Sequence, residues 1–328
     1  MNHRIYSFDE LRQLFVQYSR KNVIKSEPEG LYGPVNYIMG LQGKRIRPVI
    51  CLMVANIYIK NPEAALPLAY SIEMFHNFTL VHDDIMDKAD VRRSHPTVHV
   101  KFGHNSAILS GDLMMIKSYE HLINCCTDQD LKFRLLELFT ETAIKVCEGQ
   151  QYDMEFETSE GVNLEDYMKM IELKTAVLLG GAFKSGALIG RSSKKDANNF
   201  YDYGLNLGLA FQIQDDYLDV YGDPDVFGKK KGGDIIQKKK TFLYLKALEL
   251  TDDKLKLEQL YNSSAISGSD KVMKILKIYD SLNLREITEN TIKELTSKAE
   301  LHLNNIAAPG KNLDVIRQLQ KKLMERKS

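Results

Sequence analysis

Two short acidic motifs contain the residue types best suited to metal chemistry. Asp83-Asp-Ile-Met-Asp87 follows an apolar run at helical spacing from Ala69 to Val81, and Asp215-Asp-Tyr-Leu-Asp219 follows a similar run from Leu205 to Phe211. Aspartates four residues apart on a helix leave the same face one turn apart, where they repel each other unless a cation lies between them. Because all these ligands are oxygens, a hard cation such as Mg²⁺ suits them.

The repetition of the motif favours a functional role. A single copy is equally well explained as a solvated helix end, with Asp90 and the arginines after it as local partners. By chance, Asp-Asp-x-x-Asp occurs roughly 0.07 times in a chain of this length. Two copies are therefore a strong signal, and Gln212 lies on the same helical stripe as Asp215 and Asp219.

Two basic clusters carry the complementary charge. Lys44, Arg45 and Arg47 stand at an expected helix start, where an anion would also meet free backbone N–H groups, although a solvated turn is the simpler explanation of this cluster alone. Arg92 and Arg93 follow the first acidic motif, which fits either local charge balance or a bidentate contact with phosphate.

Other charged or titratable residues are more ambiguous. His76 lies two turns before Asp83 on the same stripe, where a lone histidine is more often a core residue. The lysine-rich run from Lys229 to Lys240 has no interleaved aromatic residues, so we expect a solvated loop and no nucleic-acid partner. Carboxylates for metal together with basic side chains indicate a diphosphate ligand, which metal ions bridge and the basic groups neutralise.

Composition limits the class of protein. The 328 residues are 44% hydrophobic, which is ample for a core, and 44 basic residues balance 44 acidic ones. No bulk charge therefore favours nucleic acid or a membrane surface. The polar N-terminus does not resemble a signal peptide, and the longest apolar stretch, Val49 to Ile59, is too short to cross a bilayer. The four cysteines show no Cys-x-x-Cys spacing, so we expect a reduced, cytoplasmic protein without stable membrane insertion.

The pattern along the chain predicts a single all-α domain over residues 1–328. Ser7 and Glu10 form a capping box that opens an amphipathic helix, and the glycines and prolines of residues 28–34 predict a loop. A long helix is expected from Pro62 to the first acidic motif, and a glycine- and lysine-rich loop over residues 222–240. Further helices are expected at about Ser106–Cys126, Asp130–Glu157 and Asp196–Val220, and from a cap at Asn163 and Asp166 through Lys174 and Thr175. No alternation typical of strands persists, so an all-α fold is predicted.

Together these motifs resemble the trans-isoprenyl diphosphate synthases, and short-chain members of that family are similar in length. The resemblance rests on Gly43-Lys-Arg-Ile-Arg-Pro48, the two acidic motifs, Arg92-Arg93 with Pro96-Thr-Val-His99, Lys174-Thr175 and Gly228-Lys229. It implies a homodimeric enzyme of the isoprenoid synthase fold, which is a helical bundle around a central cavity. This enzyme would condense isopentenyl diphosphate with allylic diphosphates, head to tail, and release pyrophosphate.

The resemblance also implies residue roles. Three Mg²⁺ ions per active site would be held by Asp83, Asp87 and Asp215, with Asp84, Asp216 and Asp219 in support. The catalytic set would be Asp83, Asp84, Asp87, Lys174, Asp215 and Asp216. The allylic diphosphate would contact Arg92, Lys174, Thr175, Gln212, Lys229 and Lys239, where Lys238 or Lys240 could replace Lys239. Isopentenyl diphosphate would be held without metal by Lys44, Arg47, His76 and Arg93. The chain departs from the family at Gln42 and Ser94, where glycine is usual.

Chain length in this family depends on the residues before the first acidic motif. Here these are Phe78 and Thr79, with Phe75 one turn deeper, and no insertion interrupts the motif. An aromatic residue followed by a small one resembles the synthases of geranylgeranyl diphosphate, which has twenty carbons, and farnesyl diphosphate with fifteen is the alternative. Both phenylalanines could also be simple core residues.

Three other classes of protein remain possible from the sequence. A class I terpene cyclase shares the first acidic motif but needs neither a second copy nor the Lys44 and Arg47 cluster. A di-iron bundle needs two Glu-x-x-His pairs, and only Glu73 to His76 matches. A non-catalytic regulatory subunit of a heteromeric synthase normally lacks aspartates from one motif, whereas both are complete here. A catalytically active prenyltransferase is therefore the favoured interpretation.

Overall fold

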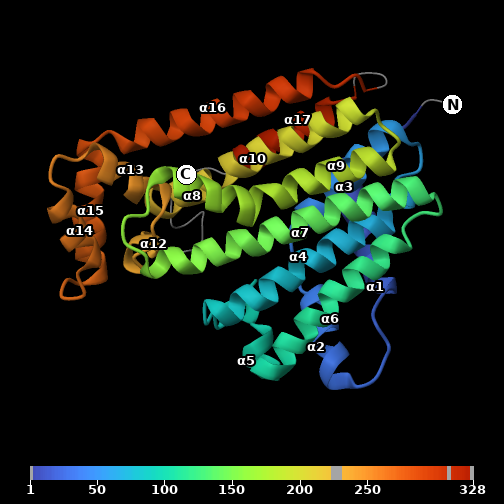
Figure 1. Cartoon of the computed structure of the whole chain (residues 1–328), viewed down its shortest axis with the longest axis horizontal. Coiled ribbons are helices and arrows are strands. Elements are labelled where there is room, and N and C mark those ends of the chain that lie inside the picture. The colour runs from blue at the N-terminus through green and yellow to red at the C-terminus, as the bar shows by residue number, and fades with distance from the viewer. Residues whose placement is uncertain (1–2, 223–230, 309–311, 326–328) are drawn as a thin grey trace. The chain divides into compact units, whose positions relative to one another are not determined.

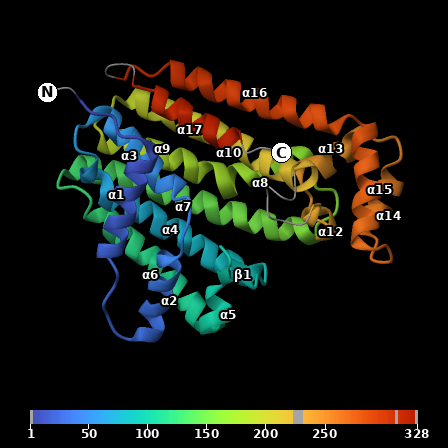
Figure 2. The ribbon, with the colours of Figure 1, turned by 180° about the vertical axis from the view of Figure 1, so that it is seen from behind.

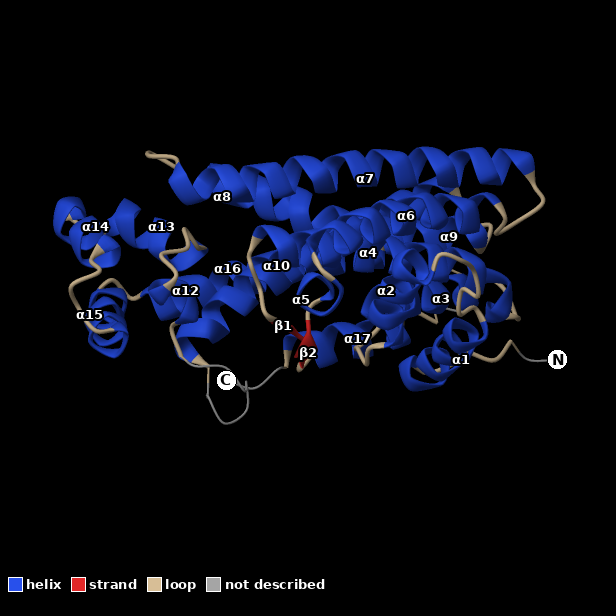
Figure 3. Ribbon diagram, turned by 90° about the horizontal axis from the view of Figure 1, so that it is seen from below, coloured by secondary structure: helices blue, strands red, loops and turns tan. Residues whose placement is uncertain are grey.

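The computed structural model describes residues 3–222, 231–308 and 312–325, and it confirms the all-α class. The strands within these ranges form one antiparallel hairpin of β1 (Val91–Arg92) and β2 (His95–Pro96), shown in red in Figure 3. No described helix is both long enough and apolar enough to cross a membrane.

The chain contacts divide it into two compact units. The first comprises Met1–Thr140, Gly181–Asn198 and Ala307–Ile316, and the second comprises Glu141–Gly180, Asn199–Ile306 and Arg317–Ser328. Residues of α7 (Gln129–Thr158), α9 (Val177–Ile189), α10 (Lys194–Tyr221) and α17 (Asp314–Met324) belong partly to each unit.

The first unit contains the N-terminal helices. These are α1 (Phe8–Lys21), α2 (Glu29–Gly40), α3 (Ile46–Tyr58), the 3₁₀ turn η1 (Pro62–Ala65), α4 (Leu66–Met86), α5 (Val98–Phe102) and α6 (His104–Ile123). The capping box predicted at Ser7 is present, because the Ser7 hydroxyl accepts from the Glu10 amide while the Glu10 carboxylate accepts from the Ser7 amide.

The predicted loop at residues 28–34 is wrong, since this segment forms the cap and the first half of α2. The helix starts after Pro28 and includes Pro34, whose missing N–H costs one hydrogen bond. Burial of one face of the helix compensates for the lost hydrogen bond, because Pro34, Val35, Ile38 and Met39 are all buried. In addition, Asn36 exchanges two hydrogen bonds with the backbone of Ile24. Tertiary packing therefore overrides the local breaker signals.

Helix α4, which ends in the first acidic motif, packs along α6 (Figure 1). Gly111 on α6 permits this close approach, because a Cβ atom there would lie 2.2 Å from the His82 ring on α4. Helix α3 also packs on α4, and Val49 to Ile57 within it are all buried. Figure 2 shows β1 beside the end of α4 that carries the aspartates. The packing thus fixes that end of α4 within the first unit.

The second unit is built around its own hydrophobic core. Its other helices are α8 (Leu164–Ile171), the π-helical turn η2 (Glu172–Ala176), α12 (Gly233–Ile236), α13 (Phe242–Leu250), α14 (Lys254–Asn262), α15 (Gly268–Ser281) and α16 (Leu284–Asn304). The predicted cap of α8 by Asn163 and Asp166 is confirmed as a reciprocal capping box. Ile213 on α10, Leu243 on α13 and Ile275 on α15 are fully buried in this core. The core therefore supports the helix that carries the second acidic motif.

Candidate active site

The three aspartates of the first motif have different environments. Asp84 is 1% exposed, and both its carboxylate oxygens accept from Arg92 Nε, at 2.7 and 2.8 Å. Burial raises the pKa of Asp84 to about 6, although Arg92 opposes this shift. Asp83 is partly exposed, with Arg92 Nη2 at 3.6 Å, and Asp87 is exposed at the C-cap of α4. Asp84 therefore fastens the β-hairpin to α4, while Asp83 and Asp87 face the more open side of the helix end.

The hairpin turn explains one departure from the family pattern. Arg93 and Ser94 are the two turn residues and have left-handed φ angles of 53° and 63°. Two such residues form the turn that suits a two-residue hairpin, and glycine adopts this conformation at least cost. Ser94 adopts it as well, at a cost of about 1 kcal/mol. The hairpin is held further by a bond from Tyr37 Oη to the Pro96 carbonyl, at 2.8 Å.

A basic cluster in the same unit has the properties of an anion site. Arg47 Nη1 lies 3.1 Å from His76 Nε2, and the buried Arg47 Nε has no hydrogen-bond partner within the described part of the chain. Burial lowers the pKa of Arg47 to about 10, with Glu73 opposing the shift and Arg93 adding to it. Burial and the neighbouring arginines hold the pKa of His76 well below its usual value, so His76 is neutral. An orphaned guanidinium N–H beside a neutral imidazole suits a bound phosphate oxygen.

A buried carboxylate holds this cluster together. Glu73 pairs with Arg45 at 2.5 Å and also accepts from Asn77 Nδ2, while Asn77 Oδ1 accepts from Arg93 Nη1 at 3.3 Å. Arg45 also donates to the Met39 and Leu41 carbonyls. The arginine side chains therefore have separate roles. Arg45 holds the backbone at the end of α2, whereas Arg47 and Arg93 belong to the basic cluster that could bind an anion.

This network includes residues that sequence reasoning missed. In the sequence, Glu73 matches only half of an iron motif, and Arg45 is one residue of a charged run. The spacing of Glu73 and Asn77, one helical turn apart, was the available signal. Gly43 lies close to the same cluster, because a Cβ atom there would lie 3.1 Å from the Arg93 guanidinium carbon and would displace the end of that side chain slightly. Lys44, which follows it, is exposed.

The second acidic motif, on α10, repeats the arrangement of the first. Asp216 is 5% exposed and accepts from Tyr167 Oη at 2.5 Å, from the Phe242 amide at 3.1 Å and from Gln212 Nε2 at 3.4 Å. Burial raises the pKa of Asp216 to about 7, against the bond from Tyr167. Asp215 and Asp219 are less buried, and Asp219 Oδ2 accepts from the backbone N–H of residue 234 at 3.0 Å. In both motifs the second aspartate is therefore the structural one.

Lys174 and Thr175 lie in the π-helical turn η2, which the sequence did not predict. Thr175 Oγ1 donates to Gln212 Oε1 at 3.3 Å, and Lys174 Nζ pairs with Asp153 at 2.5 Å. The turn is packed against Gly149, where a Cβ atom would lie 2.2 Å from the Lys174 nitrogen. Single π turns are frequent at functional sites because they redirect side chains.

The structure separates the three lysines at the end of the basic run. Lys240 Nζ donates to the Phe156 and Ser159 carbonyls, and Lys238 Nζ donates to Ser264 Oγ. Lys239 is exposed, and its ammonium has no hydrogen bond or ion pair to any described residue. Lys229 lies outside the described residues. Of these three lysines, Lys239 is therefore the one whose ammonium is available for a ligand.

Comparison with known proteins identifies the family. The polyprenyl synthetase family model matches residues 28–279. The chain belongs to the polyprenyl synthetase family. The chain is 39% identical to the geranylgeranyl diphosphate synthase of Methanosarcina mazei over 224 residues, which cover 68% of this chain and 69% of that protein. It is 35% identical to the Sulfolobus acidocaldarius enzyme of the same name, over 89% of this chain and 91% of that one.

Solved structures of this family agree in fold. A geranylgeranyl pyrophosphate synthase superposes with a TM-score of 0.93 at 40% identity, covering 98% of this chain and 100% of that one. The geranylgeranyl pyrophosphate synthetase of Pyrococcus horikoshii gives a TM-score of 0.90 at 31% identity, with 98% of each chain covered. The protein is thus a short-chain prenyltransferase of the isoprenoid synthase fold, which uses isopentenyl and allylic diphosphates.

Polyprenyl synthetases in general depend on Mg²⁺, and the residues of this chain fit that ion. Within residues 3–222, 231–308 and 312–325, no three His, Cys, Asp or Glu side chains form a group that could hold a metal by themselves. Mg²⁺ usually keeps several waters and binds through one or two carboxylates together with substrate phosphates. Asp83 with Asp87, and Asp215 with Asp219, would be two such partial ligand sets.

The prenyltransferase has an aromatic stack one to two turns before its first acidic motif. The Phe75 and Phe78 rings lie 5.5 Å apart between centroids, and Phe78 packs edge-on against His82 at 4.9 Å. On the other side, Phe75 contacts Phe139 of α7 at 5.2 Å. Thr79 donates to the His76 carbonyl at 2.8 Å. Phe75 and Phe78 are therefore fixed by packing and not free to rotate away.

Proposed function

We propose that this prenyltransferase makes geranylgeranyl diphosphate. The observation that carries the proposal is the Phe75–Phe78 stack, which lies one to two turns below the aspartates and is held by His82 and Phe139. In this proposal a growing prenyl chain that passes the aspartates meets these two buried rings. The relatives named geranylgeranyl diphosphate synthase support the same product. Farnesyl diphosphate is the second candidate, because the barrier consists of two aromatic residues.

The allylic diphosphate would be bound through both acidic motifs. In this proposal Asp83, Asp87 and Asp215 hold three Mg²⁺ ions, which neutralise the charge of the departing pyrophosphate when bound. Asp219 supports the second set through its contact with the backbone of residue 234. Asp84 and Asp216 act by positioning, as their burial and hydrogen bonds favour.

Basic and polar side chains would contact the same diphosphate directly, in addition to the metal ions. Arg92 is oriented by Asp84, and Thr175 is bonded to Gln212 beside Lys174. We propose that these groups contact the phosphate oxygens, with Lys239 as a further cation. The full set of proposed contacts is Arg92, Lys174, Thr175, Gln212, Lys229 and Lys239.

Isopentenyl diphosphate would occupy the basic cluster of the first unit. Arg47 offers a buried N–H without a partner, His76 is neutral and can donate a hydrogen bond, and Lys44 and Arg93 add charge. The carbon–oxygen bond of the allylic diphosphate breaks, and pyrophosphate leaves with the electron pair. The double bond of isopentenyl diphosphate then attacks the allylic carbon, and the released pyrophosphate takes the proton. Water would convert the cation to an alcohol, so this mechanism requires that water be excluded from the allylic carbon.

A product assay tests this proposal. The purified protein with Mg²⁺ and isopentenyl diphosphate is given dimethylallyl, geranyl or farnesyl diphosphate, and product length is read by mass spectrometry. We expect twenty carbons from the wild type and longer products from Phe78→Ala. Phe102→Ala, a half-buried phenylalanine of α5, is the control and should leave the length unchanged. A fifteen-carbon product would indicate that the barrier lies closer to the aspartates than Phe78 does. The absence of condensation with any starter would refute the proposed prenyltransferase activity.

We also propose that the enzyme is a homodimer through α6. Leu109, Ile116 and Ile123 are exposed at seven-residue spacing on this helix, and Ile116 is 61% exposed. A stripe of large exposed apolar residues is characteristic of an interface between proteins. Light scattering should give twice the chain mass for the wild type and for Asn105→Asp, an exposed control on the same helix. Ile116→Asp should give a monomer, and a monomeric wild type would refute the assignment.

A further inference from the structure

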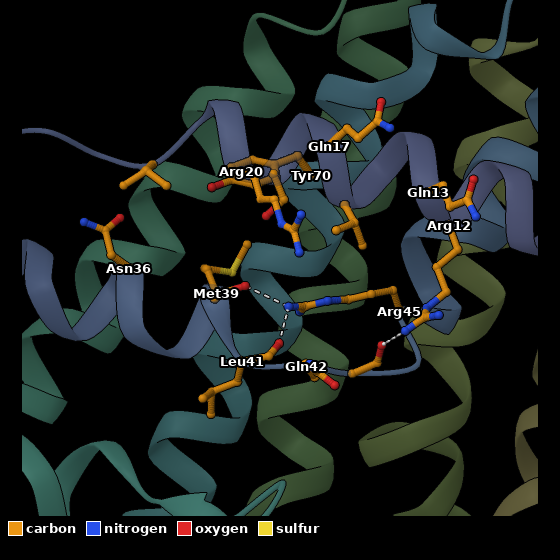
Figure 4. A pocket seen from close by; sticks show the side chains of 15 residues that line it. Arg12, Gln13, Gln17, Arg20, Asn36, Met39, Leu41, Gln42, Arg45 and Tyr70 are labelled. Atoms are coloured by element: carbon orange, nitrogen blue, oxygen red, sulfur yellow. Dashed lines mark hydrogen bonds between the residues drawn. The ribbon is translucent and has the colours of Figure 1, made fainter.

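A half-open pocket of about 430 Å³ lies in the first unit, away from the acidic motifs of the sequence. It is bounded by α1, by the end of α2 and by the segment from Leu41 to Arg45 (Figure 4). Its volume falls within the roughly 300–1,000 Å³ that small-molecule sites occupy. None of the proposed catalytic or substrate-binding residues lines it.

The charge of this pocket is positive. Arg12, Arg20 and Arg45 line it, whereas no Asp or Glu does. Arg45 is satisfied by Glu73 and two carbonyls, but Arg20 has neither a hydrogen bond nor an ion pair to the part of the chain that the structure describes. In Figure 4 the Arg20 guanidinium points into the pocket between Met39 and Arg45. An open guanidinium of this kind suits phosphate oxygens, which it can contact in a bidentate manner.

The remaining lining is divided between apolar and amide side chains. Val16 of α1 and Val23, just after this helix, line the pocket, as do Met39 and Leu41 from the other wall. Gln42 also lines it, at the position where the sequence departs from the glycine usual in the family. A site with exposed arginines beside aliphatic side chains matches a ligand with an anionic head and an apolar tail.

We propose that this pocket is a regulatory site for a prenyl diphosphate, bound with its head on Arg12 and Arg20 and its tail along the aliphatic wall. The inference rests on the proposed function only in the choice of ligand, because the enzyme itself releases such a molecule. Accumulated product would then reach a second site on the enzyme that made it.

One contact connects the pocket with the isopentenyl diphosphate cluster. Arg12 donates to the Gly43 carbonyl at 3.2 Å, and the next residue is Lys44. A ligand that draws Arg12 towards its phosphates weakens this bond and loosens the segment that carries Lys44. Binding at the pocket therefore raises the KM for isopentenyl diphosphate. By reciprocity, isopentenyl diphosphate weakens binding of the regulator by the same factor.

A kinetic experiment tests the regulatory effect. Geranylgeranyl diphosphate is added at saturating allylic substrate and Mg²⁺, and the KM for isopentenyl diphosphate is measured. Arg20→Gln should require about tenfold more of the added product for half of the effect, because one charge-assisted contact is lost. Lys21→Gln changes a neighbouring exposed charge that does not line the pocket, and it should behave as the wild type. Equal sensitivity of Arg20→Gln and Lys21→Gln would overturn the proposal.

Hydrogen exchange tests binding directly. Helix α1 contains none of the proposed catalytic residues, so the difference in its protection between Arg20→Gln and Lys21→Gln reports binding at the pocket. Geranylgeranyl diphosphate should protect residues 8–21 in the wild type and in Lys21→Gln, but much less in Arg20→Gln. Equal protection by inorganic pyrophosphate or by geranylgeraniol would overturn the need for both head and tail, and no protection would overturn the site. Turnover of the wild type without added product is measured separately, so failure of the proposed function remains distinguishable.

Discussion

Replacement of Glu73 by glutamine tests the buried network that holds the basic cluster. The side chains of Arg45 and Glu73 are only 6% and 2% exposed, and Glu73 is also the negative charge that supports Arg47 and Arg93. Glutamine keeps the shape and one acceptor oxygen, but it removes the charge. Three buried or half-buried arginines then lose their compensating carboxylate.

The expected cost is large relative to the stability of a typical protein. Removal of one partner from a buried ion pair costs about 3–5 kcal/mol, because the other charge remains desolvated. Typical domains unfold with about 5–15 kcal/mol in total. Glu73→Gln should therefore lose roughly a fifth or more of the free energy of unfolding. It should also raise the KM for isopentenyl diphosphate, since Asn77 and Arg93 lose their anchor.

Urea unfolding followed by circular dichroism measures this cost. Glu120→Gln is the matched control, because Glu120 pairs with Lys117 at 2.6 Å on the surface, where loss of a pair costs at most about 1 kcal/mol. The double variant Glu73→Leu with Arg45→Met removes both charges and should be more stable than Glu73→Gln alone. A loss from Glu73→Gln no greater than that of the control would refute the role of the network.

Two further predictions concern residues around the cluster and the second motif. Tyr167→Phe removes the hydroxyl that donates to buried Asp216, so the free energy of unfolding should fall by about 1–3 kcal/mol, and an unchanged urea midpoint would argue against a structural Asp216. His76 has a folded-state pKa well below its unfolded value of about 6.5, so the unfolded chain binds the proton first as the pH falls. Stability should therefore decline below about pH 6.5, by up to about 1.4 kcal/mol per pH unit from this residue, and His76→Gln should flatten that decline in urea titrations from pH 7 to 5. An equal slope in both proteins would contradict the assignment.

The sequence was sufficient for features that depend on local physics. Ser7 with Glu10 and Asn163 with Asp166 form the predicted capping boxes, because each box involves only residues three apart. The two acidic motifs lie on helices as expected, because their apolar runs are long and periodic. Local pattern therefore located the helices of the candidate site.

Features that depend on distant partners could not be predicted. Helix α2 forms through Pro34 because its buried face finds a partner in the fold. Asp84 and Asp216 look equivalent to their neighbours in sequence, and only Arg92 and Tyr167 distinguish them as buried acceptors. The π turn at Lys174 likewise depends on a glycine of another helix.

The division of labour within each acidic motif also bears on how such proteins change over time. A descendant that gives up catalysis gains nothing from Asp83 or Asp87, so substitutions there are free to accumulate. Asp84 still joins the hairpin to α4 in such a descendant, and loss of its carboxylate would strand Arg92. Decay of the motif should therefore begin at its first and fifth positions and spare the second. A descendant that keeps only the aspartate equivalent to Asp84 would have lost catalysis but kept the fold. A descendant that has lost this aspartate as well would need a different contact to hold its hairpin.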